Sequence, residues 1–271
     1  PTEIVVESGI VHYLFGGSNL TSDTINNNVF IKGGEVLSAY GGNRDGGVAS
    51  QTKVSVLGGD VGEVYGCGYG SETSCTLTNV LIENINDKES TIYGGGYAST
   101  TTETKVLINS GLVGNIFGGN NNDGEVEKTN VYLNGGRANN AYGGNNVGGQ
   151  TINANVFVGA GNHGSIYGGG KDATTINSNL AGISGAAEAI YGGGHNAAVE
   201  NPTLNIHGGD LSNVFGGSNE NGTINNAVVN VGTEYVHVDD PNPEFNTGQT
   251  DEPEDPNDEP ASVLLERIKA E

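Results

Sequence analysis

Short runs of hydrophobic residues alternate with polar ones and return along the chain, each followed by glycines. One run of four places aliphatic side chains at its second and fourth positions, as in residues 28–31 and 105–108. Its first position holds Lys53 and Lys105 in two of the repeats, and lysine does not lie in a dry core. The second and fourth positions therefore point inward, and each run is predicted to be a β-strand with one buried face.

A second short run ends each time in an aromatic residue followed by two or three small residues. These aromatics recur at a nearly constant interval, which indicates a repeat architecture, and glycine recurs too often for helices. The nine aromatics, which we expect to stack along the axis, are Phe15, Tyr40, Tyr65, Tyr93, Phe117, Tyr142, Tyr167, Tyr191 and Phe215.

A third and weaker run, with the form of Thr151-Ile152-Asn153, completes each repeat and is expected to bury its isoleucine. The fold class predicted is all-β: a single-stranded, right-handed parallel β-helix, or solenoid. It would have about ten coils, with three short strands in each coil of about 25 residues. The right hand follows because parallel crossovers in one sheet are almost always right-handed.

The composition changes after the repeats. Residues 1–238 are predicted to form the β-helix, with an incomplete last coil. Residues 239–260 carry most of the prolines between Asp and Glu, which is typical of an extended acidic linker. Residues 261–271 are predicted to be a short helix that either caps the solenoid or begins a following domain.

The formal net charge is −22, with only 10 Lys and Arg in 271 residues. No basic patch can be assembled from so few cations, which argues against nucleic acid and anionic membrane surfaces as partners. The sequence has no apolar run long enough to cross a bilayer, so we expect no membrane insertion. The oligomeric state cannot be read from this pattern.

The first candidate binding surface is the outward third position of the first strand. A rigid face of exposed aliphatic and aromatic side chains could bind a partner or a sugar chain. The plainer interpretation is that such residues favour strands and pair between neighbouring coils. The side chains concerned are Phe30, Leu81, Leu107, Tyr132 and Phe157.

The second candidate is the polar loop after each aromatic. Counting four and five residues beyond the aromatic places Lys171 with Asp172, His195 with Asn196, and Asn219 with Glu220 on three consecutive coils. A Lys, a His and two carboxylates on adjacent coils are suitable groups for acid–base catalysis. The alternative is a set of solvated turns, as expected at Asn120, Asn121, Asn145 and Asn146, where asparagine would tolerate left-handed backbone.

Among metal sites, catalytic motifs and disulfides, only a calcium site and a disulfide have any supporting pattern in the sequence. Residues 120–127 alternate oxygen donors around a glycine, which makes calcium a conceivable ligand, but they lack the EF-hand spacing. No zinc spacing and no catalytic motif occurs, so neither a metal site nor a catalytic residue is predicted. Cys67 and Cys75 either close a disulfide in an oxidising compartment or remain two thiols.

The repeated aliphatic residue, Gly-Gly, then Val/Ile-Tyr/Phe-Gly-Gly pattern over residues 3–226 resembles the β-helical regions of large bacterial cell-surface proteins of the adhesin or autotransporter type. The resemblance implies an extracellular, non-catalytic module for binding or display, with a host or matrix glycan or protein as partner. The alternative is a polysaccharide lyase or glycosidase, because pectate-lyase-like enzymes share the architecture. Such an enzyme would need catalytic Arg or Lys beside carboxylates, and the arginines here are only Arg44, Arg137 and Arg267.

Overall fold

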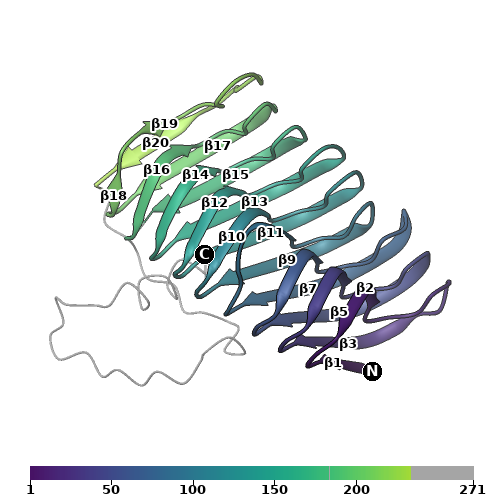
Figure 1. Cartoon of the computed structure of the whole chain (residues 1–271). Coiled ribbons are helices and arrows are strands. Elements are labelled where there is room, and N and C mark those ends of the chain that lie inside the picture. The colour runs from purple at the N-terminus through teal and green to yellow at the C-terminus, as the bar shows by residue number, and fades with distance from the viewer. Residues whose placement is uncertain (183, 233–271) are drawn as a thin grey trace, which may run out of the picture.

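The structure is a computed structural model that describes residues 1–182 and 184–232, and within them it contains strands and loops but no helix. The predicted linker (239–260), the predicted helix (261–271) and the last residues of the predicted 1–238 domain lie outside the described residues. Across the described part the chain winds as a solenoid (Figure 1).

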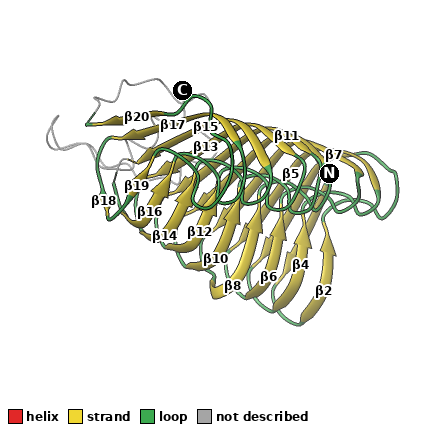
Figure 2. Ribbon diagram, turned by 90° about the horizontal axis from the view of Figure 1, so that it is seen from above, coloured by secondary structure: helices red, strands yellow, loops and turns green. Residues whose placement is uncertain are grey.

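Parallel strands form two sheets, each made by stacking one strand from every coil (Figure 2). The first sheet runs in the order β1 (Thr2–Val6), β3 (Thr24–Ile31), β5 (Gly46–Val56), β7 (Glu72–Ile82), β9 (Thr100–Ile108), β11 (Glu125–Leu133), β13 (Gln150–Val158), β15 (Thr174–Gly182), β17 (Val199–Ile206) and β20 (Val228–Val231). The second sheet contains β2 (Ile10–Phe15), β4 (Glu35–Tyr40), β6 (Asp60–Tyr65), β8 (Asn86–Tyr93), β10 (Leu112–Phe117), β12 (Arg137–Tyr142), β14 (Asn162–Tyr167), β16 (Ala186–Tyr191), β18 (Asp210–Leu211) and β19 (Val214–Phe215). The predicted parallel β-solenoid is therefore confirmed, with nine coils that contribute to both sheets and β20 from the next.

The predicted inward columns form the core. Val29, Val54 and Val106 lie in the same register column of the first sheet and are fully buried. The sequence pattern predicts that this column continues from Leu204 to Val228, but this is wrong by one residue, because Leu204 pairs with Val229. Equivalent side chains thus stack coil upon coil, and the core is a column along the axis.

The number of strands per coil differs from the prediction. Two of the three expected runs join into one long strand of the first sheet; β13, for example, spans both Thr151 and Val156. The inward side chain of the weaker run is Thr151, fully buried, while Ile152 is only partly buried. Ile25, at the same position as Ile152, is 65% exposed. The polar residue is inside because its hydroxyl meets a buried amide, with Thr151 Oγ1 lying 3.1 Å from Asn145 Oδ1.

A ladder of hydroxyl groups links the first sheet to the corner after the second sheet in several coils. In five coils a buried Thr or Ser of the first sheet donates a hydrogen bond of 2.5 to 2.7 Å to the carbonyl oxygen of the glycine that follows the corner aromatic. That glycine has no room for a side chain, because a Cβ at Gly94 or Gly118 would collide with the carbonyl of the next coil. The hydroxyl donors are Thr52, Thr78, Thr104, Thr129 and Ser178.

The corner aromatics form the expected stack. All nine rings are nearly parallel to their neighbours, with centroids 4.4 to 5.1 Å apart. The six rings from Tyr40 to Tyr167 are buried as one cluster, and Phe215 at the end is 45% exposed. The stack marks a straight edge along the solenoid, beside which the polar loops project.

Candidate ligand-binding groove

A groove follows the aromatic stack along the outside of the first coils. Its floor is the edge of the corner aromatics, and one wall is the outward face of the second sheet, where Tyr13, Ser38 and Glu63 pair in register. The other wall is formed by the residues four positions after each corner aromatic, which we call the loop column. The loop column consists of Asn19, Arg44, Tyr69, Tyr97, Asn121, Asn146, Lys171, His195 and Asn219.

Backbone hydrogen bonds hold the loop column in register. The amide of Tyr69 donates to the carbonyl of Asn43 at 3.1 Å, and the amide of Tyr97 donates to that of Gly68 at 3.0 Å. The same bond recurs from Arg44 to Asn219, so this wall is as regular as the sheets.

The groove encloses about 770 Å³ over the first coils, a volume in the range of small-molecule binding sites. Tyr13 is 65% exposed, Leu37 51% and Tyr69 43%, so three large side chains present apolar surface to solvent. The complete lining is Tyr13, Phe15, Leu37, Ser38, Tyr40, Arg44, Gly62, Glu63, Tyr65, Tyr69, Glu89, Thr91, Tyr97 and Asn121.

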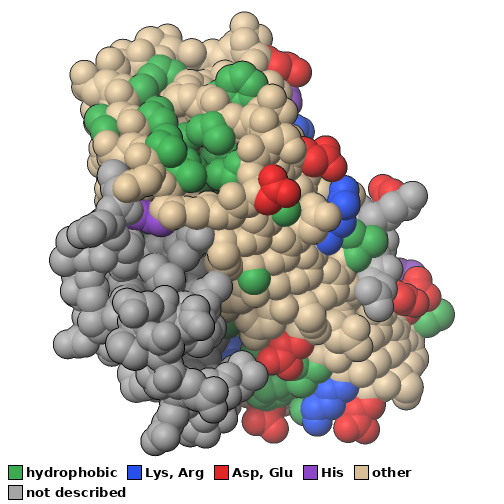
Figure 3. All heavy atoms as spheres, turned by 90° about the vertical axis from the view of Figure 1, so that its left-hand side faces the viewer, with side chains coloured by type: hydrophobic (Ala, Val, Ile, Leu, Met, Phe, Trp, Pro, Cys, Tyr) green, Lys and Arg blue, Asp and Glu red, His purple; other side chains and the backbone are tan. Residues whose placement is uncertain are grey.

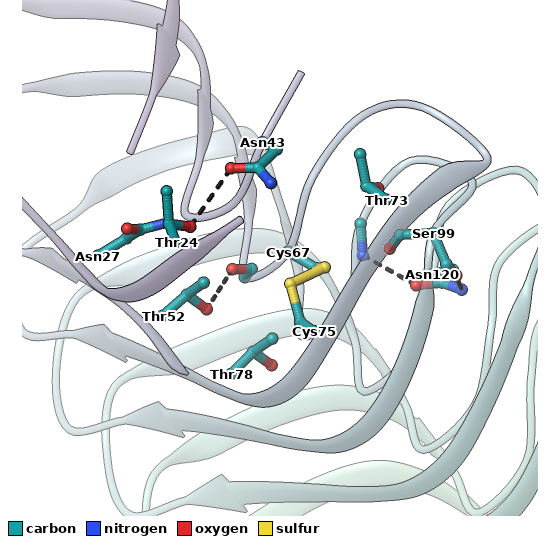
Figure 4. Close-up of a disulfide and its surroundings, with 12 residues drawn as sticks. Thr24, Asn27, Asn43, Thr52, Cys67, Thr73, Cys75, Thr78, Ser99 and Asn120 are labelled. Atoms are coloured by element: carbon teal, nitrogen blue, oxygen red, sulfur yellow. Dashed lines mark hydrogen bonds between the residues drawn. A yellow bond between two sulfur atoms is a disulfide. The ribbon is translucent and has the colours of Figure 1, made fainter. Parts of the chain in front are cut away.

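The longest coil departs from the regular repeat in two places, a loop and a strand, and both places line this groove. The step from Tyr65 to Tyr93 is longer than any other between neighbouring corner aromatics, and each wall of the groove contains part of the excess. Cys67, in the loop after Tyr65, is joined by a disulfide to Cys75 of β7 (Figure 4). The two cysteines lie on either side of Tyr69 in the sequence. Both cysteines are buried, so of the two alternatives left open by the sequence the structure has the disulfide.

The opposite wall contains a β-bulge. Residues 87–91 of β8 span the distance that residues 113–115 span in β10, which adds two residues to β8. The bulge places Glu89 in the groove lining beside Thr91. Bulges in regular sheets commonly redirect side chains at functional sites.

Hydrogen bonds and one carboxylate set the polarity of the groove. Ser38 Oγ donates to Glu63 Oε2 at 3.2 Å, and Asn121 Nδ2 donates to the hydroxyl of Tyr65 at 2.8 Å. Burial first, and then the negative charge of Glu63, raises the pKa of the Tyr40, Tyr65 and Tyr93 hydroxyls. These phenols therefore stay protonated and can donate hydrogen bonds at any physiological pH.

The predicted Lys171–Glu220 group lies farther along the same loop column. His195 Nε2 is 3.6 Å from Glu220 Oε1, so these two side chains meet across adjacent coils as expected. Lys171 Nζ is 3.6 Å from Asp172 Oδ2 within its own loop, and Asn196 donates to the same carboxylate at 3.1 Å. The structure brings the group together in pairs; the binding role predicted for these residues and the alternative of acid–base catalysis both stay untested.

The predicted hydrophobic ladder is in register but is not an open face. Leu107, Tyr132 and Phe157 are only 4 to 6% exposed, so the expectation of an exposed surface is wrong there. Stacking on neighbouring coils accounts for part of this burial, since the rings of Tyr132 and Phe157 lie 5.0 Å apart. Phe30 and Leu81, in the same register column, are partly buried.

The asparagines expected in solvated turns have a different role. Asn120 and Asn145 are fully buried, and no described residue other than glycine has a positive φ. The Asn120 side chain accepts from the amide of Gly96 at 2.8 Å and donates to the carbonyl of Ser99 at 2.6 Å (Figure 4). Both partners lie in the loop of the preceding coil, so the Asn120 oxygen that a calcium ion over residues 120–127 would use accepts from a backbone amide instead.

His163 is likewise an internal side chain. It is fully buried, its Nδ1 accepts from the amide of Ala138 at 3.2 Å, and its Nε2 lies 2.8 Å from the carbonyl oxygen of Ala160. Burial lowers the pKa of His163, because a charged imidazole would lose its hydration there.

Among the described residues, no three or more His, Cys, Asp or Glu side chains gather as metal ligands. The same part of the chain contains no helix with the length and apolar character needed to cross a bilayer. Comparison with protein-family models, with curated proteins and with solved structures gives no significant match, so function must be argued from the groove itself.

The sequence reasoning missed the groove residues Tyr13, Glu63, Tyr69 and Tyr97. A signal was present, because Tyr69 and Tyr97 occupy the loop column on consecutive coils, beside the one step that is clearly longer than the rest. In that column the sequence pattern indicates candidate chemistry at Lys171, His195 and Asn219, and ordinary turns at Asn121 and Asn146.

Proposed function

We propose that this protein is a non-catalytic binding module in which a rigid β-solenoid holds an aromatic groove open for an extended ligand. The observation that carries the proposal is the groove lined by Tyr13, Tyr69 and Tyr97. Tyrosine supplies rigid, amphipathic contact surface at low cost in conformational entropy, which suits a preformed binding site.

We place the module outside the cell, at a cell surface. Disulfides persist in oxidising compartments, and Cys67–Cys75 supports such a location. An adhesin-like role on a bacterial surface agrees with the resemblance of the repeats, with a glycan or a protein of a host or matrix as partner. The acidic, proline-rich residues 239–260 would then space the module from whatever follows.

Binding by the full chain to a panel of immobilised neutral glycans, acidic glycans and basic peptides tests the proposal. The informative variant is Tyr69→Ala combined with Tyr97→Ala, which removes one wall of the groove. Phe215→Ala is the matched control, because Phe215 is an aromatic of similar exposure outside the groove. The proposal requires at least one partner whose binding is lost in the double variant and kept in the control.

A further inference from the structure

The geometry points to a neutral glycan, an extended chain of uncharged sugar units, as the ligand of the tyrosine groove, lying parallel to the solenoid axis. This inference rests on the proposed binding function and adds the chemical class and direction of the ligand.

The shape of the groove favours a linear polymer. The groove crosses β2, β4, β6 and β8 and their loops, so its length runs along the stack of coils. The three rings of its floor, those of Phe15, Tyr40 and Tyr65, lie 4.8 and 4.4 Å apart, a repeat of the same order as the length of one sugar unit. The units of a sugar chain can therefore follow the coils of the solenoid, although the side chains that they meet differ from coil to coil.

The side chains of the groove match a polyol. The exposed surfaces of Tyr13 and Tyr69 can contact the apolar face of a sugar ring, as tyrosine does in wet interfaces. Glu63 supplies acceptors, Arg44 supplies donors, and Asn121 supplies both, within hydrogen-bonding reach of a ligand that has many hydroxyl groups.

Charge argues against an acidic ligand, because Glu63 and the net charge of −22 would repel it. The net charge would attract a polycation, but the exposed surfaces of Tyr13, Leu37 and Tyr69 offer a basic peptide no ion pair, and Arg44 lies in the same lining. An uncharged ligand can use both the polar groups and the apolar surfaces of the groove, and the charged groups of the groove do not repel it.

Arg44 and Tyr69 are held in place before any ligand binds. Arg44 Nε is 3.5 Å from Asp45 Oδ1, and Arg44 Nη1 donates to Asn19 Oδ1 at 3.1 Å. The disulfide closes the loop of Tyr69, whose ring stacks on Tyr97 at 4.8 Å and meets Tyr40 edge-on. Pre-ordering of this kind lowers the entropic cost of binding.

The experiment is calorimetric titration of the full chain with neutral oligosaccharides of increasing length, of several linkages, at low and high salt. We expect affinity to rise with length until each lining coil meets one unit, and to change little with salt because no charge is neutralised. Tyr69→Ala and Tyr97→Ala should each weaken binding by about tenfold, the usual effect of truncating an anchoring tyrosine. Tyr69→Phe should keep most of the affinity, and Phe215→Ala should keep all of it.

Four results would count against the inference. Binding of basic peptides that depends on Tyr69 and weakens with salt, without binding of neutral glycans, would overturn the glycan and leave the binding function standing. Binding of acidic glycans alone through the same residues would do likewise. Glycan binding that both tyrosine variants leave intact, or no groove-dependent partner of any class, would overturn the binding function as well.

Discussion

The hydroxyl ladder makes a sharp prediction at Thr104. Its side chain is fully buried in β9, and its Oγ1 donates to the carbonyl oxygen of Gly118 at 2.6 Å. Thr104→Val keeps the β-branched shape and replaces the hydroxyl with a methyl group, so the change removes one hydrogen bond with little change in volume. Thr102→Val is the matched control, because Thr102 lies in the same strand with its side chain exposed.

The expected loss of unfolding free energy follows from the carbonyl oxygen of Gly118, which stays buried without its hydroxyl donor. A net hydrogen bond contributes about 1 kcal/mol, and a buried acceptor without its donor costs about 1–3 kcal/mol. Thr104→Val should therefore lower the free energy of unfolding by about 1–3 kcal/mol, while Thr102→Val should change it by less than about 0.5 kcal/mol.

Denaturant unfolding followed by far-ultraviolet circular dichroism measures the difference. Coils of a solenoid need not unfold as one unit, so the midpoint and the slope should both be compared. Equal midpoints for the two variants would refute the view that the hydroxyl bond closes each coil. A thermal scan provides a check, since about 1 kcal/mol shifts the melting temperature by about 2–4 °C at this chain length.

Three further predictions concern the same framework. Ala154 occupies the ladder without a hydroxyl, so Ala154→Ser should add the missing bond to Gly168 and raise unfolding stability by about 0.5–1.5 kcal/mol; a decrease would show that the site cannot hold the oxygen. Replacing Cys67 and Cys75 together by alanine should cost about 2–3 kcal/mol from the loop-closure model, and free-thiol titration of the native protein should find none in this pair. Because the pKa of His163 is lowered, stability should be complete above about pH 6.5 and fall as pH decreases below it, since the unfolded chain takes up the proton first; the fall should be shallower in His163→Leu.

Most of the fold could be predicted because the repeat samples each position many times. A single valine says little, but Val29, Val54 and Val106 at one position, beside lysine at the preceding one, fix which side faces inward. The strand count could not be obtained this way. Whether two runs join depends on the turn between them, and Ile152 next to Thr151 gave the wrong inward residue because the interior there is polar.

The groove was harder to predict because it depends on irregularity and on neighbours in different coils. Glu63 and Asn121 are ordinary surface residues until the register places both beside Tyr65. The burial of Leu107 at an outward position likewise cannot be predicted from the alternation of hydrophobic and polar residues. Alternation indicates on which side of the sheet a side chain lies, but not whether other residues bury it there. What the sequence did contain was the long coil and its two cysteines.

Hydrophobic side chains gather over the last coils, around β18–β20 (Figure 3), where Phe215 and Val229 are partly exposed although their equivalents in earlier coils are buried. The reason is that the side chains of each coil are buried by the next coil, and the last described coil has no such neighbour among the described residues. Deletion of one complete repeat, such as residues 131–155, would join Asn130 directly to Val156. Val156 would then take the position of Val131, its partner in register, and every column of equivalent residues would stay aligned. The reach of the rod can therefore change only in whole-number increments of about 4.8 Å, and duplication or loss of a repeat in the gene would alter its length without altering its cross-section.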